Sequence, residues 1–184
     1  MKRDKIAFGD FTCDVFSLLK DRWLLLTAGE KERGKFNMMT IAWAAFGVMW
    51  EKPFALVVVR PSRYTYEYME KGGDFTLCAL PEDCRSKLLL CGTKSGRDID
   101  KVAESGFTVI PSTSVRSPAF DQAELIVECR KIYHDDYKPA NFMAAYIEKA
   151  YGGRDYHRMY FGEIVAIHGT AFYSRGTHGG RAGS

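Results

Sequence analysis

Six short apolar stretches, separated by turn residues, dominate the pattern of hydrophobic and polar positions along the chain. They are rich in β-branched, aromatic or other apolar side chains, and Gly, Pro or charged residues mostly bound them, which is typical of β-strands. The stretches cover residues 22–29, 37–50, 53–59, 74–80, 123–132 and 158–173. We expect the second stretch to bend near Gly47.

Helical patterns are fewer and shorter. We expect helices at residues 65–71 (Thr65 as N-cap, Gly72-Gly73 at the end), 81–90 (opened by Pro81) and 98–105 (ended by Gly106), and a helical excursion at 137–151. Strands outnumber helices and do not alternate strictly with long helices, which disfavours a doubly wound parallel sheet. The pattern favours a mainly β fold, an antiparallel barrel with peripheral helices.

Length and composition limit the domain organisation. A chain of 184 residues suits one domain, and no internal repeat or low-complexity linker divides it. We expect a single domain over residues 1–174, with the helical insertion at about 137–151, and a flexible glycine-rich tail at 175–184.

Charge and cysteine content exclude several classes of protein. The net charge is only +3, which does not indicate nucleic acid as a partner. No apolar run approaches the roughly 20 residues needed to span a bilayer, and the charged start does not resemble a signal peptide. Five scattered cysteines without a CxxC motif indicate reduced, mostly buried thiols in a cytoplasmic protein.

The stretch from Arg60 to Lys71 combines a strand end, a turn and a helix start. Helix N-termini expose unpaired N–H groups and a partial positive charge, so they suit phosphate. Arg63 adds a bidentate donor and Thr65 a hydroxyl. From this stretch alone, an anion site and a capped surface helix with solvated arginines are equally favoured.

The stretch CGTKSGRDIDK, residues 91–101, offers similar chemistry. Ser95 to Asp98 matches a capping pattern, so a helix is expected to begin there. Arg97 and Lys101 are four residues apart and fall on the outer face of that helix, where they could hold an anion. On this stretch alone, a capped amphipathic helix with a solvated charged face is the favoured interpretation. The glycine spacing does not match a P-loop, and Cys91 is interpreted as a packing residue.

The strand pattern NMMTIAWAA, residues 37–45, could border a flat aromatic ligand. Its Met and Ala side chains are apolar, and Asn37 and Thr40 add placed polar groups. The alternative is a core strand in which Met fills space. That alternative is weaker for Asn37 and Thr40, which need partners if they are buried.

His157 is a lone histidine just before the last strand. A lone histidine is more often a surface residue than a catalytic one. The four histidines lack the spacing of metal ligands, so no metal site is predicted, and no nucleophile motif is present.

Together these stretches resemble the flavin reductase-like, FMN-binding split-barrel family, and most closely its flavoredoxin-type members. The motifs that carry the resemblance are Asn37–Thr40 with Trp43, Arg60–Thr65, Ser95–Asp98 with Lys101, and His157 ahead of Tyr160–Ile164. Each motif alone is weak, but the four in order are fairly specific for the family.

The resemblance implies a six-stranded antiparallel Greek-key barrel with surrounding helices, a homodimer, and one FMN bound non-covalently near the dimer interface. The residues expected along the isoalloxazine and ribityl chain are Asn37, Met38, Met39, Thr40 and Trp43. Those expected around the phosphate are Arg63, Thr65, Ser95 and Lys101, and His157 is the candidate catalytic residue near the flavin ring or the substrate. The 137–151 segment departs from the family pattern, because it lengthens the connection before His157.

In function, the resemblance implies hydride transfer from NADH or NADPH to flavin, followed by electron transfer to a small-molecule or protein acceptor. No G-x-G-x-x-G fingerprint is present, so the nicotinamide would have to stack transiently on an open flavin face. Two alternatives remain open: a flavoredoxin-type electron-transfer protein without NAD(P)H activity, and a cofactor-free barrel that acts as a binding module.

Overall fold

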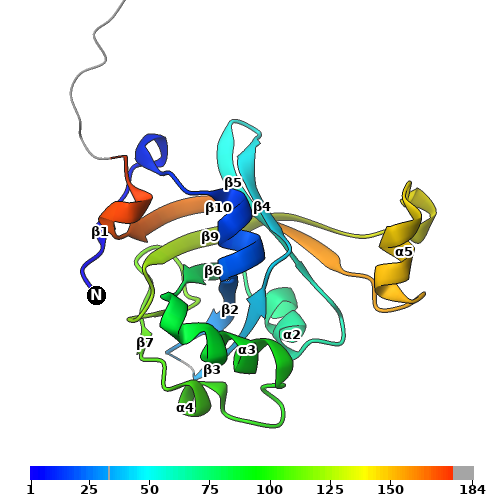
Figure 1. Ribbon diagram of the computed structural model, residues 1–184, viewed down its shortest axis with the longest axis horizontal. Helices are drawn as coiled ribbons and strands as arrows, with labels where there is room; N and C mark the ends of the chain where they lie inside the picture. Colours follow the sequence, from blue (N-terminus) through cyan, green and yellow to red (C-terminus); the bar gives the residue numbers. More distant parts are fainter. Residues whose placement is uncertain (33, 176–184) are drawn as a thin grey trace, which may run out of the picture.

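The computed structural model describes residues 1–32 and 34–175, in which one antiparallel sheet dominates (Figure 1). Its strands follow the order β3-β2-β6-β9-β10-β5-β4, and the short β1 (Asp4–Lys5) pairs with β10. The strands are β2 (Leu24–Glu30), β3 (Lys35–Ile41), β4 (Ala44–Met49), β5 (Lys52–Val59), β6 (Asp74–Ala79), β9 (Leu125–Asp136) and β10 (Arg158–Gly169). A separate ribbon pairs β7 (Val109–Ile110) with β8 (Ala119–Phe120).

The sheet closes through the chain itself. β3 and β4 stand at opposite ends of the strand order, yet only Ala42 and Trp43 separate them along the chain. They are therefore two halves of one bent strand that joins both edges of the sheet. Counting β3 and β4 as one strand, the barrel has six strands. Since β6, β9 and β10 then return between β2 and β5, the predicted antiparallel Greek-key barrel is confirmed.

The expected bend near Gly47 was wrong in its position. The strand breaks at Ala42–Trp43, whereas Gly47 lies inside β4, opposite Phe54 of β5. A Cβ atom on Gly47 would lie 2.9 Å from the Phe54 ring, so glycine serves a close approach there rather than a bend.

Most of the helices lie around the barrel near β2 and β3, and one stands apart at the end of a projecting ribbon (Figure 1). They are α1 (Val15–Ser17), α2 (Tyr64–Lys71), α3 (Arg85–Thr93), α4 (Lys101–Ser105) and α5 (Ala145–Tyr151). A π-helical turn spans Leu18–Arg22, and 3-10 turns span Phe8–Asp10, Glu82–Cys84, Pro139–Asn141 and Ala171–Tyr173. The last of these turns replaces the end of the strand expected at 158–173, because β10 stops at Gly169.

Two hydrophobic clusters explain why residues 24–28 are buried without alternation. Leu24 and Leu26 point into the barrel with Phe75 and Tyr160, whereas Leu25 packs on the outer face under α3. Both faces of β2 are thus covered, and each buried leucine contributes about 1.5–3 kcal/mol relative to an exposed position.

The cysteines behave as the sequence suggested. Cys13 is partly exposed, the other four are buried, and all five are free thiols. Burial raises the pKa of Cys91 to about 11, which leaves it a packing residue. None of the described helices is long and apolar enough to cross a membrane.

The helical excursion expected at 137–151 is present. β9 and β10 run beyond the barrel as a two-stranded ribbon that carries the 3-10 turn and α5 (Figure 1). We call residues 131–159, which form this ribbon and its helices, the arm. The tail expected at 175–184 lies outside the described residues except for Arg175.

Two predicted helix starts were wrong. α4 begins at Lys101 instead of Asp98, because the Asp100 carboxylate caps it by accepting hydrogen bonds from Val102 N (2.9 Å) and Ala103 N (3.1 Å). α2 begins at Tyr64 with Arg63 at the N-cap, so Thr65 is not the capping residue.

Candidate functional site

A cavity of about 450 Å³ lies where β3, the start of α2 and the loop between α3 and α4 meet. We call it the cationic cavity, because Arg60, Arg63, Lys94, Arg97 and Lys101 line it. Three motifs far apart in the sequence supply its wall. Six residues predicted to bind the cofactor line it: Asn37, Met39, Arg63, Thr65, Ser95 and Lys101.

Lys101 is a buried cation at the wall of this cavity. Only 6% of the surface of Lys101 is exposed, and its Nζ donates hydrogen bonds to the carbonyl oxygens of Met38 (2.9 Å) and Cys91 (2.8 Å). Burial lowers the pKa of Lys101 to about 8, and repulsion by Arg63 acts in the same direction. In the described part of the chain no carboxylate pairs with Nζ.

The expectation that Lys101 faces solvent together with Arg97 was wrong. Because Asp100 caps the helix, the first residue of α4 turns inward over β3. Arg97 stays exposed, and its guanidinium pairs with Glu67 (2.6 Å) and lies 4.7 Å from the centre of the Tyr64 ring. Lys101 is thus available to an anion in the cavity, whereas the charge of Arg97 is already matched.

Arg63 is the second unmatched cation. It is exposed at the N-cap of α2, and its guanidinium has no hydrogen-bond or ion-pair partner among residues 1–32 and 34–175. Arg60, in contrast, lies 3.9 Å from Asp155 and 5.0 Å from the centre of the Tyr151 ring. A phosphate fits this donor set, because it would relieve the mutual repulsion of Arg63 and Lys101 and accept hydrogen bonds from both.

Asn37 and Thr65 fix the floor of the cationic cavity. Asn37 Nδ2 donates to the buried Thr65 hydroxyl (2.8 Å). The turn after α3 closes over this pair, since a Cβ atom on Gly96 would overlap Asn37 Oδ1. Ser95 Oγ accepts from Arg97 N (3.1 Å) and so shapes the same turn.

Met38 and Thr40 do not reach the cationic cavity. Strand alternation turns Met38 into the core under α3, where only its carbonyl serves Lys101. Thr40 Oγ1 donates to the Leu88 carbonyl (2.6 Å), which ties α3 to β3.

Trp43 and His157 form a second group at the base of the arm. Their ring centres are 5.1 Å apart, and His157 Nδ1 is hydrogen bonded to the Tyr151 hydroxyl (2.8 Å). Burial, with the nearby charges of Arg60 and Arg63, lowers the pKa of His157 to about 4, against an opposing effect of Asp155. The imidazole is therefore neutral at pH 7.

A further cavity of about 590 Å³, which we call the arm cavity, adjoins this group. Its apolar wall comes from Trp43, Phe142, Tyr146, Ile147, Tyr151 and Met159. Sequence reasoning missed it, although the run of aromatic residues in the 137–151 segment was a signal.

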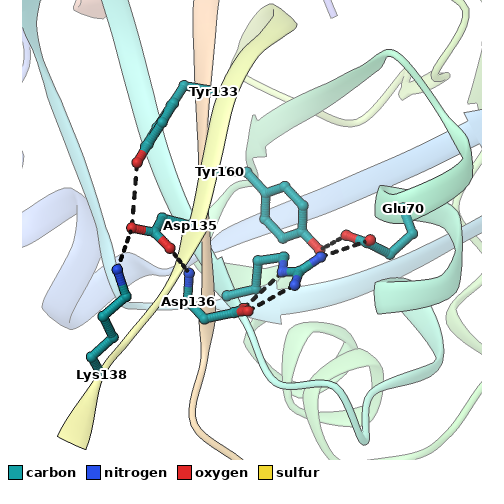
Figure 2. A network of polar contacts seen from close by, with 7 residues as sticks. Glu70, Tyr133, Asp135, Asp136, Lys138 and Tyr160 are labelled. Atoms are coloured by element: carbon teal, nitrogen blue, oxygen red, sulfur yellow. Dashed lines mark hydrogen bonds and ion pairs between the residues drawn. The ribbon is translucent and has the colours of Figure 1, made fainter. Parts of the chain in front are cut away.

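Carboxylates and cations are paired at the polar wall of the arm cavity, which Asp135, Asp136 and Lys138 line (Figure 2). Arg158 donates to both oxygens of Asp136 (2.7 Å each) and to Glu70 (2.8 Å). Asp135 accepts from Lys138 (3.5 Å) and the Tyr133 hydroxyl (3.3 Å). Because Glu70 belongs to α2, its bond with Arg158 anchors the arm to that helix, and the Tyr160 hydroxyl, just beyond the arm, also donates to Glu70 (2.6 Å).

Comparison with known proteins gives a family match. The family model described as "Flavin reductase like domain" matches residues 17–176. An uncharacterized protein of Pyrococcus abyssi is 26% identical over 117 residues, which cover 63% of this chain and 64% of that protein. The match thus spans less than two thirds of the length of this curated relative.

Solved structures share the fold. Flavoredoxin of Desulfovibrio vulgaris (Miyazaki F) has a TM-score of 0.61 and 21% identity, covering 79% of this chain and 67% of its own. An FMN-binding domain of a flavin reductases-like enzyme from Shewanella baltica OS155 has a TM-score of 0.65 and 17% identity, covering 91% and 77%. The NADH:FAD oxidoreductase of Streptomyces globisporus C-1027 has a TM-score of 0.58 and 14% identity, covering 79% and 73%. At these identities the likeness establishes the fold alone, and it confirms the expected split barrel.

Proposed function

Because the chain belongs to the flavin reductase like domain family, we propose that it is an FMN-binding oxidoreductase that uses NADH or NADPH to reduce a second acceptor. The names of the similar structures support this proposal, since they include an FMN-binding domain and an NADH:FAD oxidoreductase. The overall reaction oxidises NAD(P)H and transfers two electrons to the acceptor.

One observation carries the cofactor assignment. Lys101 is a buried cation without an acidic partner in the described chain, and it borders the same cavity as the unmatched Arg63. Leaving a buried charge unpaired is unfavourable, so this wall favours a dianionic phosphate. Arg63 and Lys101 would hold the phosphate, and Ser95 would border its approach.

The remaining residues would position the flavin. Asn37, held by Thr65, and Met39 line the cavity on the strand that leads to Trp43. When bound, FMN supplies the redox chemistry by accepting a hydride and passing on electrons. We assign His157 the role of a neutral hydrogen-bond donor beside it: with the Tyr151 hydroxyl as donor to Nδ1, the ring proton is held on Nε2.

Flavin binding is the first test. Purified protein titrated with FMN is expected to quench flavin fluorescence with a stoichiometry of one per chain. A colourless protein that takes up no added FMN would contradict both redox assignments and favour a cofactor-free binding module.

The electron donor is tested separately. In anaerobic stopped-flow mixing, NADH or NADPH is expected to bleach the absorbance of bound FMN. Bound flavin that stays oxidised at millimolar donor would instead identify a flavoredoxin-type electron-transfer protein, which receives its electrons from a partner.

We also propose that the chain forms a homodimer. An exposed aromatic cluster supports this proposal: Trp50 is 59% and Tyr133 46% exposed, and both pack against Phe161. Sedimentation equilibrium is expected to give twice the chain mass, and a monomer at micromolar concentration would refute the proposal.

A further inference from the structure

We infer that the arm cavity binds an uncharged planar arene, such as a quinone, as the second electron acceptor. The inference rests on the proposed function, because it names the class of acceptor for that reaction. It concerns the 137–151 segment, which supplies most of the lining of the arm cavity.

Size and lining suit a small aromatic molecule. A volume of about 590 Å³ falls within the range of small-molecule sites, roughly 300–1,000 Å³. Phe142 and Tyr151 are stacked with their ring centres 5.8 Å apart and their planes at 9°, and Trp43 meets Tyr151 edge-on at 6.3 Å. Flat aromatic walls of this kind favour a flat aromatic ligand.

The charge pattern selects an uncharged ligand. Asp136 accepts hydrogen bonds from Nε and Nη2 of Arg158. Asp135 accepts from Lys138 and the Tyr133 hydroxyl (Figure 2). Each carboxylate at the wall thus has a cationic partner. A charged ligand would be desolvated against paired groups without a free counter-charge, whereas a neutral ring loses little on entry.

The location suits an acceptor. Tyr151 lines the arm cavity and its hydroxyl binds His157, and Trp43 contacts both rings. Arg60 lines the cationic cavity, while its guanidinium lies over the Tyr151 ring and donates to the carbonyl of Ala150 (3.3 Å). A residue that lines the cationic cavity, Arg60, is therefore in direct contact with a residue that lines the arm cavity, Tyr151.

The redox balance is simple for a quinone. NAD(P)H loses a hydride and becomes NAD(P)⁺, and the quinone gains two electrons and two protons to become a hydroquinone. One proton comes with the hydride equivalent and the other from water.

Binding can be measured without turnover. Isothermal titration of the protein, saturated with FMN, uses 2-naphthol as an uncharged probe and naphthalene-2-sulfonate as its anionic counterpart. We expect one 2-naphthol per chain, binding of the sulfonate weaker by at least about tenfold, and displacement of 2-naphthol by duroquinone, whose ring positions are all substituted.

A matched pair of variants locates the site. Ala150→Phe fills the cavity, because Ala150 lines it, and is expected to weaken 2-naphthol binding by at least about tenfold. Lys149→Phe places the same ring at the neighbouring exposed position of α5, outside the cavity lining, and is expected to bind as the wild type does. Should Ala150→Phe fail to fold, Tyr146→Ala removes one exposed wall residue and is expected to weaken binding in the same direction.

Several outcomes would overturn the inference. The first is the absence of 2-naphthol binding, and the second is equal affinity of wild type for the two probes. The third is that Ala150→Phe binds 2-naphthol as tightly as wild type does. The fourth is a change of oligomeric mass in Ala150→Phe that accompanies the loss of binding, since a second copy of the chain would then occupy the cavity. FMN affinity is recorded for every variant. A protein that binds FMN but no arene contradicts this inference alone, and one that binds the arene but no FMN contradicts the proposed cofactor.

Discussion

The cationic cavity and the arm cavity are linked by the contact between Arg60 and Tyr151, yet their charged residues are arranged in opposite ways. In the first, Lys101 and Arg63 face the space without acidic partners in the described chain. In the second, Asp135 and Asp136 are matched by Lys138 and Arg158 (Figure 2). Unmatched positive charge indicates that a ligand should carry negative charge, whereas fully paired charges indicate that a ligand should be uncharged.

Removing the buried cation, Lys101, is expected to have the largest effect on the difference between the two cavities. Lys101→Met keeps the buried stem but removes the charge, so FMN binding should weaken by about 1.5–3 kcal/mol, or about 10- to 150-fold. Fluorescence titration measures the dissociation constant. Glu104→Gln, on the exposed side of α4, is the control and should bind like wild type; equal constants for the two variants would argue against the phosphate role.

Removing the cation that pairs the carboxylates of the arm cavity is expected to leave unmatched negative charge there, the opposite of the unmatched positive charge in the cationic cavity. Arg158→Met leaves Asp136 and Glu70 without their shared partner. We expect a loss of about 1–2 kcal/mol in the free energy of unfolding, because two carboxylates remain near one another. Urea denaturation measures the loss, and an unchanged midpoint would show that the network does not anchor the arm to α2.

The pH dependence of FMN binding should distinguish the cavities more finely. Since burial lowers the pKa of Lys101 to about 8, the cation is present below that pH and lost above it. FMN affinity should therefore fall by about three- to tenfold from pH 8 to pH 9, while 2-naphthol affinity stays constant until the naphthol itself ionises. The fall should vanish in Lys101→Met; its persistence would place the titrating group elsewhere.

The smallest expected effect concerns the boundary between the cavities. Tyr151→Phe removes the hydrogen bond to Nδ1, which stabilises the neutral imidazole. The pKa of His157 should rise from about 4 by about 0.5–1. Nitrogen-15 NMR of the ring follows both the titration and the tautomer, and an unchanged spectrum would remove Tyr151 from any positioning role.

Sequence reasoning went furthest where local chemistry decides the structure. The strands, the free cysteines and the residues of the cationic cavity follow from short patterns. The orientation of Lys101 could not be predicted, because Ser95 and Asp100 are both good capping residues and tertiary packing chooses between them. Thr40 alternates with Met39 along β3, and its hydroxyl is bonded to the Leu88 carbonyl of α3 rather than lining the cationic cavity.

The arm cavity escaped prediction for another reason. Its wall joins Trp43, Met159 and the side chains of α5, and no local pattern reveals which distant residues will face one another. The paired charges of Asp136 and Arg158 likewise depend on the register of β9 and β10, in which these residues lie opposite each other.

The bent strand that closes the barrel also limits the distance between the two cavities. Met39 borders the cationic cavity and Trp43 the arm cavity, and four peptide units of one continuous backbone separate them. A fully extended chain spans at most about 3.6 Å per residue, so the Cα atoms of these two residues cannot be more than about 14 Å apart. Side-chain substitutions can widen or fill either cavity, but only an inserted or deleted residue in this segment can change the spacing between the two cavities.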